Sequence, residues 1–181
     1  MGESVKVGIT GLPGAGKTYA LIRVIEMLEA DEFTVGGMIT ESIIEDERRV
    51  GFYVVDWATE VRRVFAHMDI DSKIQVGKYG VDIEALEEIG VQAIRNATTD
   101  SDIVVIDEVG KMEVESEPFI KAVKDALDAD KPLILTLHKK SRNPLLQDIR
   151  RRDDIRILEV TAVNKNLLPY KIVKLLKGEI L

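Results

Sequence analysis

Residues 11–18 read Gly11-Leu12-Pro13-Gly14-Ala15-Gly16-Lys17-Thr18 and match the pattern G-x-x-x-x-G-K-[ST] at every position. Glycines in such a loop let the backbone turn sharply and point successive N–H groups at the oxygens of a phosphate. The lysine, here Lys17, reaches the β and γ phosphates, and the hydroxyl of Thr18 is a ligand for Mg²⁺. We therefore predict that these eight residues bind the phosphates of a nucleotide.

The segments on either side of this loop provide the context that the motif requires. An apolar run at 5–10 predicts a buried strand, and residues 17–30 carry apolar side chains at helical spacing. The positive end of that helix then faces the same anion as the loop amides. A dinucleotide-binding fingerprint does not fit, because it requires another glycine where the chain has Tyr19.

The rest of the chain alternates between apolar strands and amphipathic helices. β-Branched runs at 35–44 and 50–57 predict an antiparallel hairpin, and the run at 60–67 is a candidate third strand. Further strands are predicted at 103–106, 132–137 and 155–161, and further helices at 84–97, 116–129, 144–151 and 167–177. This order predicts an α/β fold, with a mainly parallel sheet flanked by helices and an antiparallel hairpin extension. We expect one domain over residues 1–181.

Composition excludes several classes of function. The chain has 181 residues and a formal net charge of −7, which disfavours a nucleic-acid or anionic-membrane binder because both need a positive surface. Without cysteine, disulfides and Cys-ligated zinc are excluded, and with only His67 and His138 a histidine metal site is not expected. No apolar run approaches the ~20 residues of a membrane span. With no signal-peptide pattern at the amino terminus, we expect a cytoplasmic protein.

Two adjacent carboxylates, Asp107 and Glu108, follow the apolar run at 103–106. In a parallel sheet the ligand site lies beyond the carboxyl ends of the strands, which places both residues near the phosphate loop. Asp107 is our candidate for holding Mg²⁺ together with Thr18. Glu108 is our candidate for orienting or deprotonating an attacking water, and it joins Lys17 as a predicted catalytic residue.

The run Asp107-Glu108-Val109-Gly110 also fits the D-x-x-G of GTPase switches. Those proteins read guanine with N-K-x-D, in which the aspartate accepts hydrogen bonds from the base. The late segment here is Asn164-Lys165-Asn166-Leu167, and a leucine side chain cannot accept a hydrogen bond. A guanine-nucleotide switch is therefore disfavoured.

His138 follows the strand at 132–137, which we expect between the strands that end at Thr10 and Asp107. In that position it could sense the γ phosphate or the attacking water, so it is our third candidate catalytic residue. Thr136 is a weaker candidate for the same role. The alternative for His138 is an ordinary polar residue at the end of a strand.

The segment 139–152 forms a local basic patch in an acidic chain. One of its residues could contact the transferring phosphoryl group, as arginine fingers do, and Arg142 is our candidate because it is the arginine nearest the strand end. For most of the patch we expect a solvated helix face, and nucleic-acid binding through it is disfavoured. Its other members are Lys139, Lys140, Arg150, Arg151 and Arg152.

With these residues assembled, the chain resembles the thermophile nucleoside-triphosphatase family, whose eukaryotic members are called cancer-related nucleoside-triphosphatases. The resemblance extends over nearly the whole chain. Beside the phosphate loop, its most specific segments are Gly77-Lys78-Tyr79-Gly80-Val81-Asp82 and Asp107-Glu108-Val109-Gly110-Lys111-Met112-Glu113. It implies a RecA-like P-loop domain that hydrolyses nucleoside triphosphates to diphosphates and phosphate, with Mg²⁺ and broad tolerance of the base.

Two positions depart from the family pattern. The hairpin usually carries an arginine near position 44, where this chain has Ile44, and a late Asn-Arg pair is present here as Asn164-Lys165. If either arginine helps to bind base or phosphate, turnover or nucleotide preference would differ in this chain. Tyr79 is left with two interpretations, stacking on a base or anchoring a loop.

The leading hypothesis is therefore Mg²⁺-dependent hydrolysis of ATP, GTP and, we expect, CTP and UTP. A kinase for a small or nucleotide-like acceptor would use the same phosphate site, although the chain has no distinct acceptor motif or Arg-rich lid. A regulatory module controlled by its nucleotide state is the third hypothesis. The expected partners are nucleoside triphosphates, without membrane or nucleic acid. The oligomeric state stays open, and a monomer is compatible with the sequence.

Overall fold

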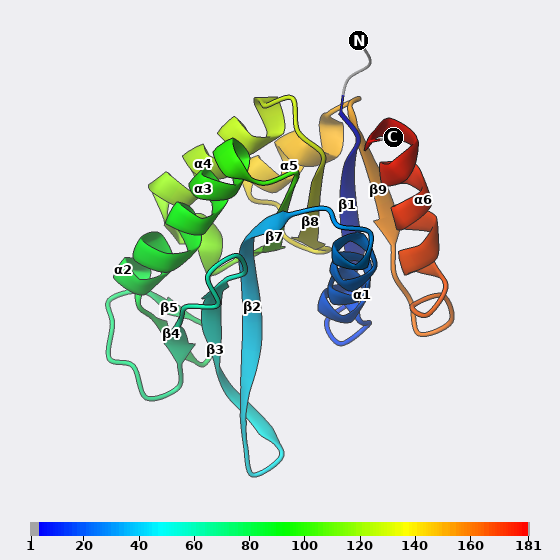
Figure 1. The fold of residues 1–181 in the computed structure, drawn as a ribbon. Helices are drawn as coiled ribbons and strands as arrows, with labels where there is room; N and C mark the ends of the chain where they lie inside the picture. The colour runs from blue at the N-terminus through cyan, green and yellow to red at the C-terminus, as the bar shows by residue number, and fades with distance from the viewer. Residues whose placement is uncertain (1–3, 181) are drawn as a thin grey trace.

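A nine-stranded sheet forms the centre of the structure, which is a computed structural model describing residues 4–180 (Figure 1). The strand order is β5-β6-β4-β3-β2-β7-β8-β1-β9. Neighbours are parallel among β1 (Lys6–Gly11), β2 (Val35–Glu45), β7 (Ile103–Val109), β8 (Leu133–His138) and β9 (Ile155–Glu159). Beyond β2 the pairs are antiparallel, through β3 (Arg48–Asp56), β4 (Arg62–His67), β6 (Tyr79–Val81) and β5 (Gln75–Val76).

Helices cover both faces of the sheet (Figure 1). One hydrophobic core lies under α1 (Lys17–Ala30) and α6 (Leu168–Ile180). A second core lies under α3 (Gln92–Asp100), α4 (Glu117–Asp128) and α5 (Pro144–Arg151). The short helix α2 (Ile83–Ala85) and a π-helical turn at Leu86–Val91 lead into α3. Within residues 4–180, no helix combines the length and the apolar character needed to cross a membrane.

Strand β7 shows how the sequence builds two cores from one sheet. Its residues at 103–106 are all β-branched and fully buried, which suits a strand that is covered on both faces. Because side chains alternate along a strand, Ile103 and Val105 enter the core under α1, whereas Val104 and Ile106 enter the core under α4. A fully apolar run therefore identifies a central strand.

The predicted hairpin is β2–β3. Its turn residues Asp46 and Glu47 both have positive φ, 49° and 63°, which is the conformation that joins two strands through a two-residue loop. Strand β4 adds the third strand at 62–67. The antiparallel part is nevertheless larger than predicted, because β5 and β6 extend the sheet by two further strands. They have only two and three residues, which is too short for a recognisable alternation.

The strand order brings the carboxyl ends of β1, β7 and β8 together. β8 lies between the other two, and α1 begins beside the same edge of the sheet. Figure 1 shows the β2–β3 hairpin projecting past this edge, next to α1. The residues that follow these strands therefore meet at the start of the first helix, with the hairpin alongside.

Leu28 tests the core that holds α1 in place. Its side chain is 0% exposed, so Leu28→Ala leaves a cavity and is expected to lower the free energy of unfolding by about 2–5 kcal/mol in urea denaturation. The matched control is Leu167→Ala, at a leucine that is 73% exposed, where a change below about 0.5 kcal/mol is expected. Equal losses for the two variants would contradict this packing.

Candidate active site

The phosphate loop joins the end of β1 to the start of α1. Gly16 precedes the helix with a φ of 106°, in the left-handed region, and no described side chain caps the first turn. Gly11 is needed for close approach, because a Cβ there would lie 2.8 Å from the carbonyl oxygen of Val160. The uncapped N–H groups and the helix dipole make this turn suitable for binding an anion.

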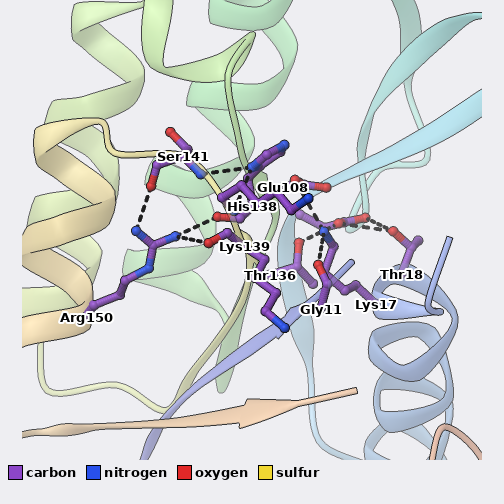
Figure 2. Close-up of polar contacts among 11 residues, drawn as sticks. Gly11, Lys17, Thr18, Glu108, Thr136, His138, Lys139, Ser141 and Arg150 are labelled. Atoms are coloured by element: carbon purple, nitrogen blue, oxygen red, sulfur yellow. Dashed lines mark hydrogen bonds and ion pairs between the residues drawn. The ribbon is translucent and has the colours of Figure 1, made fainter. Parts of the chain in front are cut away.

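Lys17 lies across the loop and is only 8% exposed. Its Nζ donates a 3.2 Å hydrogen bond to the carbonyl oxygen of Gly11 and lies 3.7 Å from Oε2 of Glu108 (Figure 2). The ammonium group thus sits between the loop and the acidic residues that follow β7. A phosphate held by the loop would meet this cation at short range.

Asp107 is fully buried and connects three elements. The hydroxyl of Thr18, in the first turn of α1, lies 3.2 Å from Oδ1 and 3.0 Å from Oδ2 of Asp107. The hydroxyl of Thr136, on β8, donates a 2.6 Å hydrogen bond to Oδ1. Burial raises the pKa of Asp107 to about 6, although the hydrogen bonds from the two threonines act in the opposite direction. The structure thus brings a carboxylate and a hydroxyl together, and both are ligands that Mg²⁺ prefers.

Glu108 is more open than its neighbour, with 25% of its side chain exposed. The pairing of β7 with β8 shifts register between Ile106 and Val109, so neither Asp107 nor Glu108 has a partner in this ladder, and the peptide bond between them is cis. Burial raises the pKa of Glu108, while the positive charges of Lys17 and Arg49 lower it. The outcome is a partly desolvated carboxylate beside the ammonium group of Lys17.

A third carboxyl group, that of Glu113, lies at the same corner, although its role was not predicted from the sequence. A Cβ at Gly110 would lie 2.9 Å from Oε1 of Glu113 and 3.1 Å from Oε2 of Glu108, so the two side chains converge on this glycine. Burial raises the pKa of Glu113 well above its usual range, and the charges of Glu108 and Asp107 raise it further. The sequence did offer one indication, because Glu113 is the last residue of the family segment at 107–113 and stands between the apolar residues Met112 and Val114.

His138 ends β8 and lines the same cavity as Lys17 and Glu108. Its Nδ1 accepts hydrogen bonds from the backbone N–H groups of Lys140 and Ser141, at 3.2 and 3.1 Å. These bonds assign the hydrogen of the neutral ring to Nε2. Burial lowers the pKa of His138, and nearby positive charges, led by that of Lys111, lower it further. His138 is therefore a neutral hydrogen-bond donor. Thr136, by contrast, already donates its hydroxyl to Asp107.

No residue of the basic patch at 139–152 lines this cavity. Arg150 donates hydrogen bonds of 2.7 Å to the carbonyl oxygens of His138 and Ser141, and so braces the segment after β8 (Figure 2). Arg142 is not among the residues that line the cavity, so the structure gives no support to it as an arginine finger. Two further members form ion pairs, Lys139 with Glu159, and Arg152 with Asp128 and Asp154.

A cavity of about 910 Å³ opens over the phosphate loop and extends to the antiparallel strands. Its volume falls within the range of small-molecule sites, roughly 300–1,000 Å³. One wall consists of the loop, the start of α1 and the acidic corner. The opposite wall comes from β2, β3 and the β5–β6 turn, through Thr40, Glu41, Ser42, Arg49, Phe52, Trp57, Val76, Gly77 and Tyr79.

Tyr79 packs against the strand that forms this opposite wall. Its hydroxyl donates a 3.4 Å hydrogen bond to the carbonyl oxygen of Arg49, and its ring meets that of Phe52 edge-on, with centroids 5.4 Å apart. The hydroxyl and one part of the ring are thus already engaged. These contacts favour the interpretation of Tyr79 as a loop anchor over the one in which it stacks on a base.

The two positions that depart from the family pattern both have a cation nearby. Ile44 is exposed on β2 and pairs with Arg49 across the hairpin. Lys165 lies beside the phosphate loop, where its Cδ would be 3.5 Å from a Cβ at Gly16, and its ammonium lies 5.8 Å from the ring centroid of Tyr19. Positive charge is therefore retained close to both positions.

The sheet order, the two helical layers and the glycine loop between β1 and α1 define a P-loop nucleoside-triphosphatase fold. A family model described as NTPase matches residues 6–173. A protein from Picrophilus torridus called nucleoside-triphosphatase THEP1 is 38% identical, over 97% of this chain and 97% of its own length. The chain belongs to this nucleoside-triphosphatase family, which confirms the resemblance identified from the sequence.

Two solved structures are similar to the chain along nearly its whole length. The crystal structure of THEP1 from the hyperthermophile Aquifex aeolicus has a TM-score of 0.83 and 30% identity, covering 96% of this chain and 99% of the other. The solution structure of a human cancer-related nucleoside triphosphatase has a TM-score of 0.82 and 31% identity, covering 97% and 98%. The same architecture is thus present in both relatives.

The buried Asp107 should make stability depend on pH when nucleotide and metal are absent. Burial raises its pKa from 3.8 to about 6, so the folded state binds the proton more tightly than the unfolded state. The free energy of unfolding then falls as pH rises from about 4 to about 6. Asp107→Asn removes this titration and keeps an oxygen that can accept from Thr18 and Thr136. In urea melts from pH 4 to 7, the variant should gain roughly 3 kcal/mol relative to the wild type. A pH-independent difference would contradict the raised pKa.

Proposed function

We propose that this chain hydrolyses nucleoside triphosphates to nucleoside diphosphates and phosphate. The proposal is carried by the position of Glu108, whose partly exposed carboxylate lies 3.7 Å from Nζ of Lys17 and lines the cavity above the phosphate loop. A water held by this carboxylate would face the γ phosphate of a nucleotide bound by the loop. The relatives named nucleoside-triphosphatase support the same reaction.

The phosphate loop and Lys17 are proposed to bind the β and γ phosphates. The N–H groups at the start of α1 point at the anion, and Lys17 exchanges its hydrogen bond with Gly11 for one with a phosphate oxygen. His138 presents a neutral Nε2–H to the same cavity, because its Nδ1 is engaged by the backbone. We assign His138 to donate to a γ-phosphate oxygen.

Mg²⁺ is the metal that we propose, with Thr18 and Asp107 as its protein-side partners. Their oxygens lie 3.0 and 3.2 Å apart and are hard donors, so the residues present fit this ion. Between residues 4 and 180, no group of three or more His, Cys, Asp or Glu side chains could hold a metal by itself. That suits Mg²⁺, which keeps waters and takes its other ligands from substrate phosphates. When bound, the ion supplies positive charge to the β and γ oxygens.

The hydrolytic step uses Glu108 as the base. A water oxygen attacks the γ phosphorus, the bond from this phosphorus to the β–γ bridging oxygen breaks, and the nucleoside diphosphate leaves. Glu108 orients the water and takes its proton as the new bond forms. Burial raises the pKa of Glu108 and so strengthens it as a base, whereas the charges of Lys17 and Arg49 favour its ionised form.

We also propose that the chain accepts several bases. A guanine clamp would require an acceptor at position 167, where the apolar side chain of Leu167 is largely exposed. The contacts that the phosphate loop makes are common to all nucleoside triphosphates. Affinity should therefore depend on the triphosphate and metal more than on the base.

The reaction itself is tested with purified protein and ATP, GTP, CTP or UTP. We expect phosphate release from all four when Mg²⁺ is present, and loss of release when the metal is chelated, since the developing charge is then not neutralised. The measurement is phosphate and nucleoside diphosphate formed in equal amounts. Diphosphate formation that required an added acceptor alcohol would instead indicate a kinase.

Glu108→Gln tests the base. The amide keeps the shape of the side chain but cannot take a proton, so turnover should fall by ~10²–10⁴-fold while nucleotide binding persists. Turnover is measured by phosphate release and binding by calorimetry. The matched control is Glu115→Gln, at an exposed glutamate that does not line the cavity. Near-normal turnover of the Glu108 variant would remove this residue from the mechanism.

A further inference from the structure

Arg49 brings positive charge to the wall of the cavity that faces the phosphate loop. It lies on β3, in the arm of the hairpin that projects beside α1, and it lines the cavity together with Lys17, Thr18 and Glu108. Two arginines of the neighbouring strand β4 form ion pairs, Arg62 with Glu41 and Arg63 with Glu88. Among the described residues, no carboxylate lies within ion-pair distance of Arg49, although the chain is acidic overall.

Aromatic packing holds this guanidinium group in place. Its Cζ lies 5.3 Å from the ring centroid of Phe52, and the ring of Tyr79 packs edge-on against Phe52, with centroids 5.4 Å apart. The Tyr79 hydroxyl donates to the carbonyl oxygen of Arg49 and ties the β5–β6 turn to β3. These contacts give a function to the tyrosine of the Gly-Lys-Tyr-Gly segment. They position the arginine before any ligand binds.

The charge of Arg49 acts at the hydrolytic end of the site. Glu108 lies 3.7 Å from Nζ of Lys17, and Arg49 lines the same cavity as both side chains. The guanidinium group is therefore part of the cavity in which the γ phosphate is proposed to lie. In the 139–152 segment, Arg150 donates to backbone carbonyls and Arg152 forms ion pairs with two aspartates.

We propose that Arg49, supplied by the β2–β3 hairpin of the same chain, contacts the γ-phosphoryl group during hydrolysis. The proposal rests on the proposed nucleoside-triphosphatase function. As the bond to the bridging oxygen breaks, negative charge spreads over the γ oxygens and the leaving oxygen. The planar guanidinium can donate two parallel hydrogen bonds to this group, which a point-like ammonium cannot do. Arg49 thereby acts from the side of the nucleotide opposite the phosphate loop.

The test compares Arg49→Ala and Arg49→Lys with Arg48→Ala. Arg48 is the matched control, because it precedes Arg49 on β3, is exposed, and does not line the cavity. Arg49→Ala should lower kcat by about 10²–10³-fold, the loss typical of one transition-state donor, with a much smaller change in ADP affinity. Arg49→Lys should stay impaired because it lacks the fork of donors. Added methylguanidinium should partly restore the alanine variant, which a merely structural loss would not allow.

A second readout follows the transition state directly. ADP with aluminium fluoride and Mg²⁺ should be trapped tightly by the wild type and by Arg48→Ala, but weakly by Arg49→Ala, while the thermal midpoints of all three agree. Turnover of Arg49→Ala within about threefold of the wild type, or an equal loss in Arg48→Ala, would overturn the role of Arg49 and leave the hydrolase intact. A wild-type protein that binds triphosphates without hydrolysing them would instead reject the proposed function, and this role with it.

Discussion

The buried carboxylate of Asp107 is the constraint on which the rest of the site depends. Placing an ionisable group out of reach of water is costly unless hydrogen bonds satisfy it, and the hydroxyls of Thr18 and Thr136 do so here. Because Thr18 belongs to α1 and Thr136 to β8, the same contacts align the first helix with the carboxyl edge of the sheet. The phosphate loop lies between β1 and that helix, so its geometry depends on these contacts.

Three carboxyl groups lie at this corner of the molecule, and they differ in burial and in the charges that surround them. Asp107 is buried beside hydroxyls, Glu113 is buried beside other carboxylates, and Glu108 is partly open and faces cations. Burial raises the pKa of each group, but only Glu108 has nearby positive charge as a leading opposing cause. These differences support the proposed roles of Asp107 in metal binding and of Glu108, the partly open member, as the base.

The parts of the fold that the sequence predicted best are those set by local pattern. The bounds of α1 and α5 agree with their helical periodicity, and the buried run at 103–106 identifies a central strand. Strands β5 and β6 were missed because two or three residues are too few to show a recognisable alternation. They form through tertiary pairing, β6 with β4 and β5 with β6. The charge of the 139–152 patch suggested a contact with phosphate. A run of charged residues in the sequence does not reveal that Arg150 binds backbone carbonyls.

The amino-acid sequence alone determined the phosphate loop and the paired acids after a buried strand, because each is a short motif with fixed spacing. The same motifs identified the family. The tertiary structure decided which distant groups meet. It placed Glu113 against Glu108, fixed the tautomer of His138 through backbone N–H groups, and set Arg49 opposite Lys17 across one cavity. Such contacts join residues far apart in the chain, and their formation depends on strand order and packing, which no local spacing encodes.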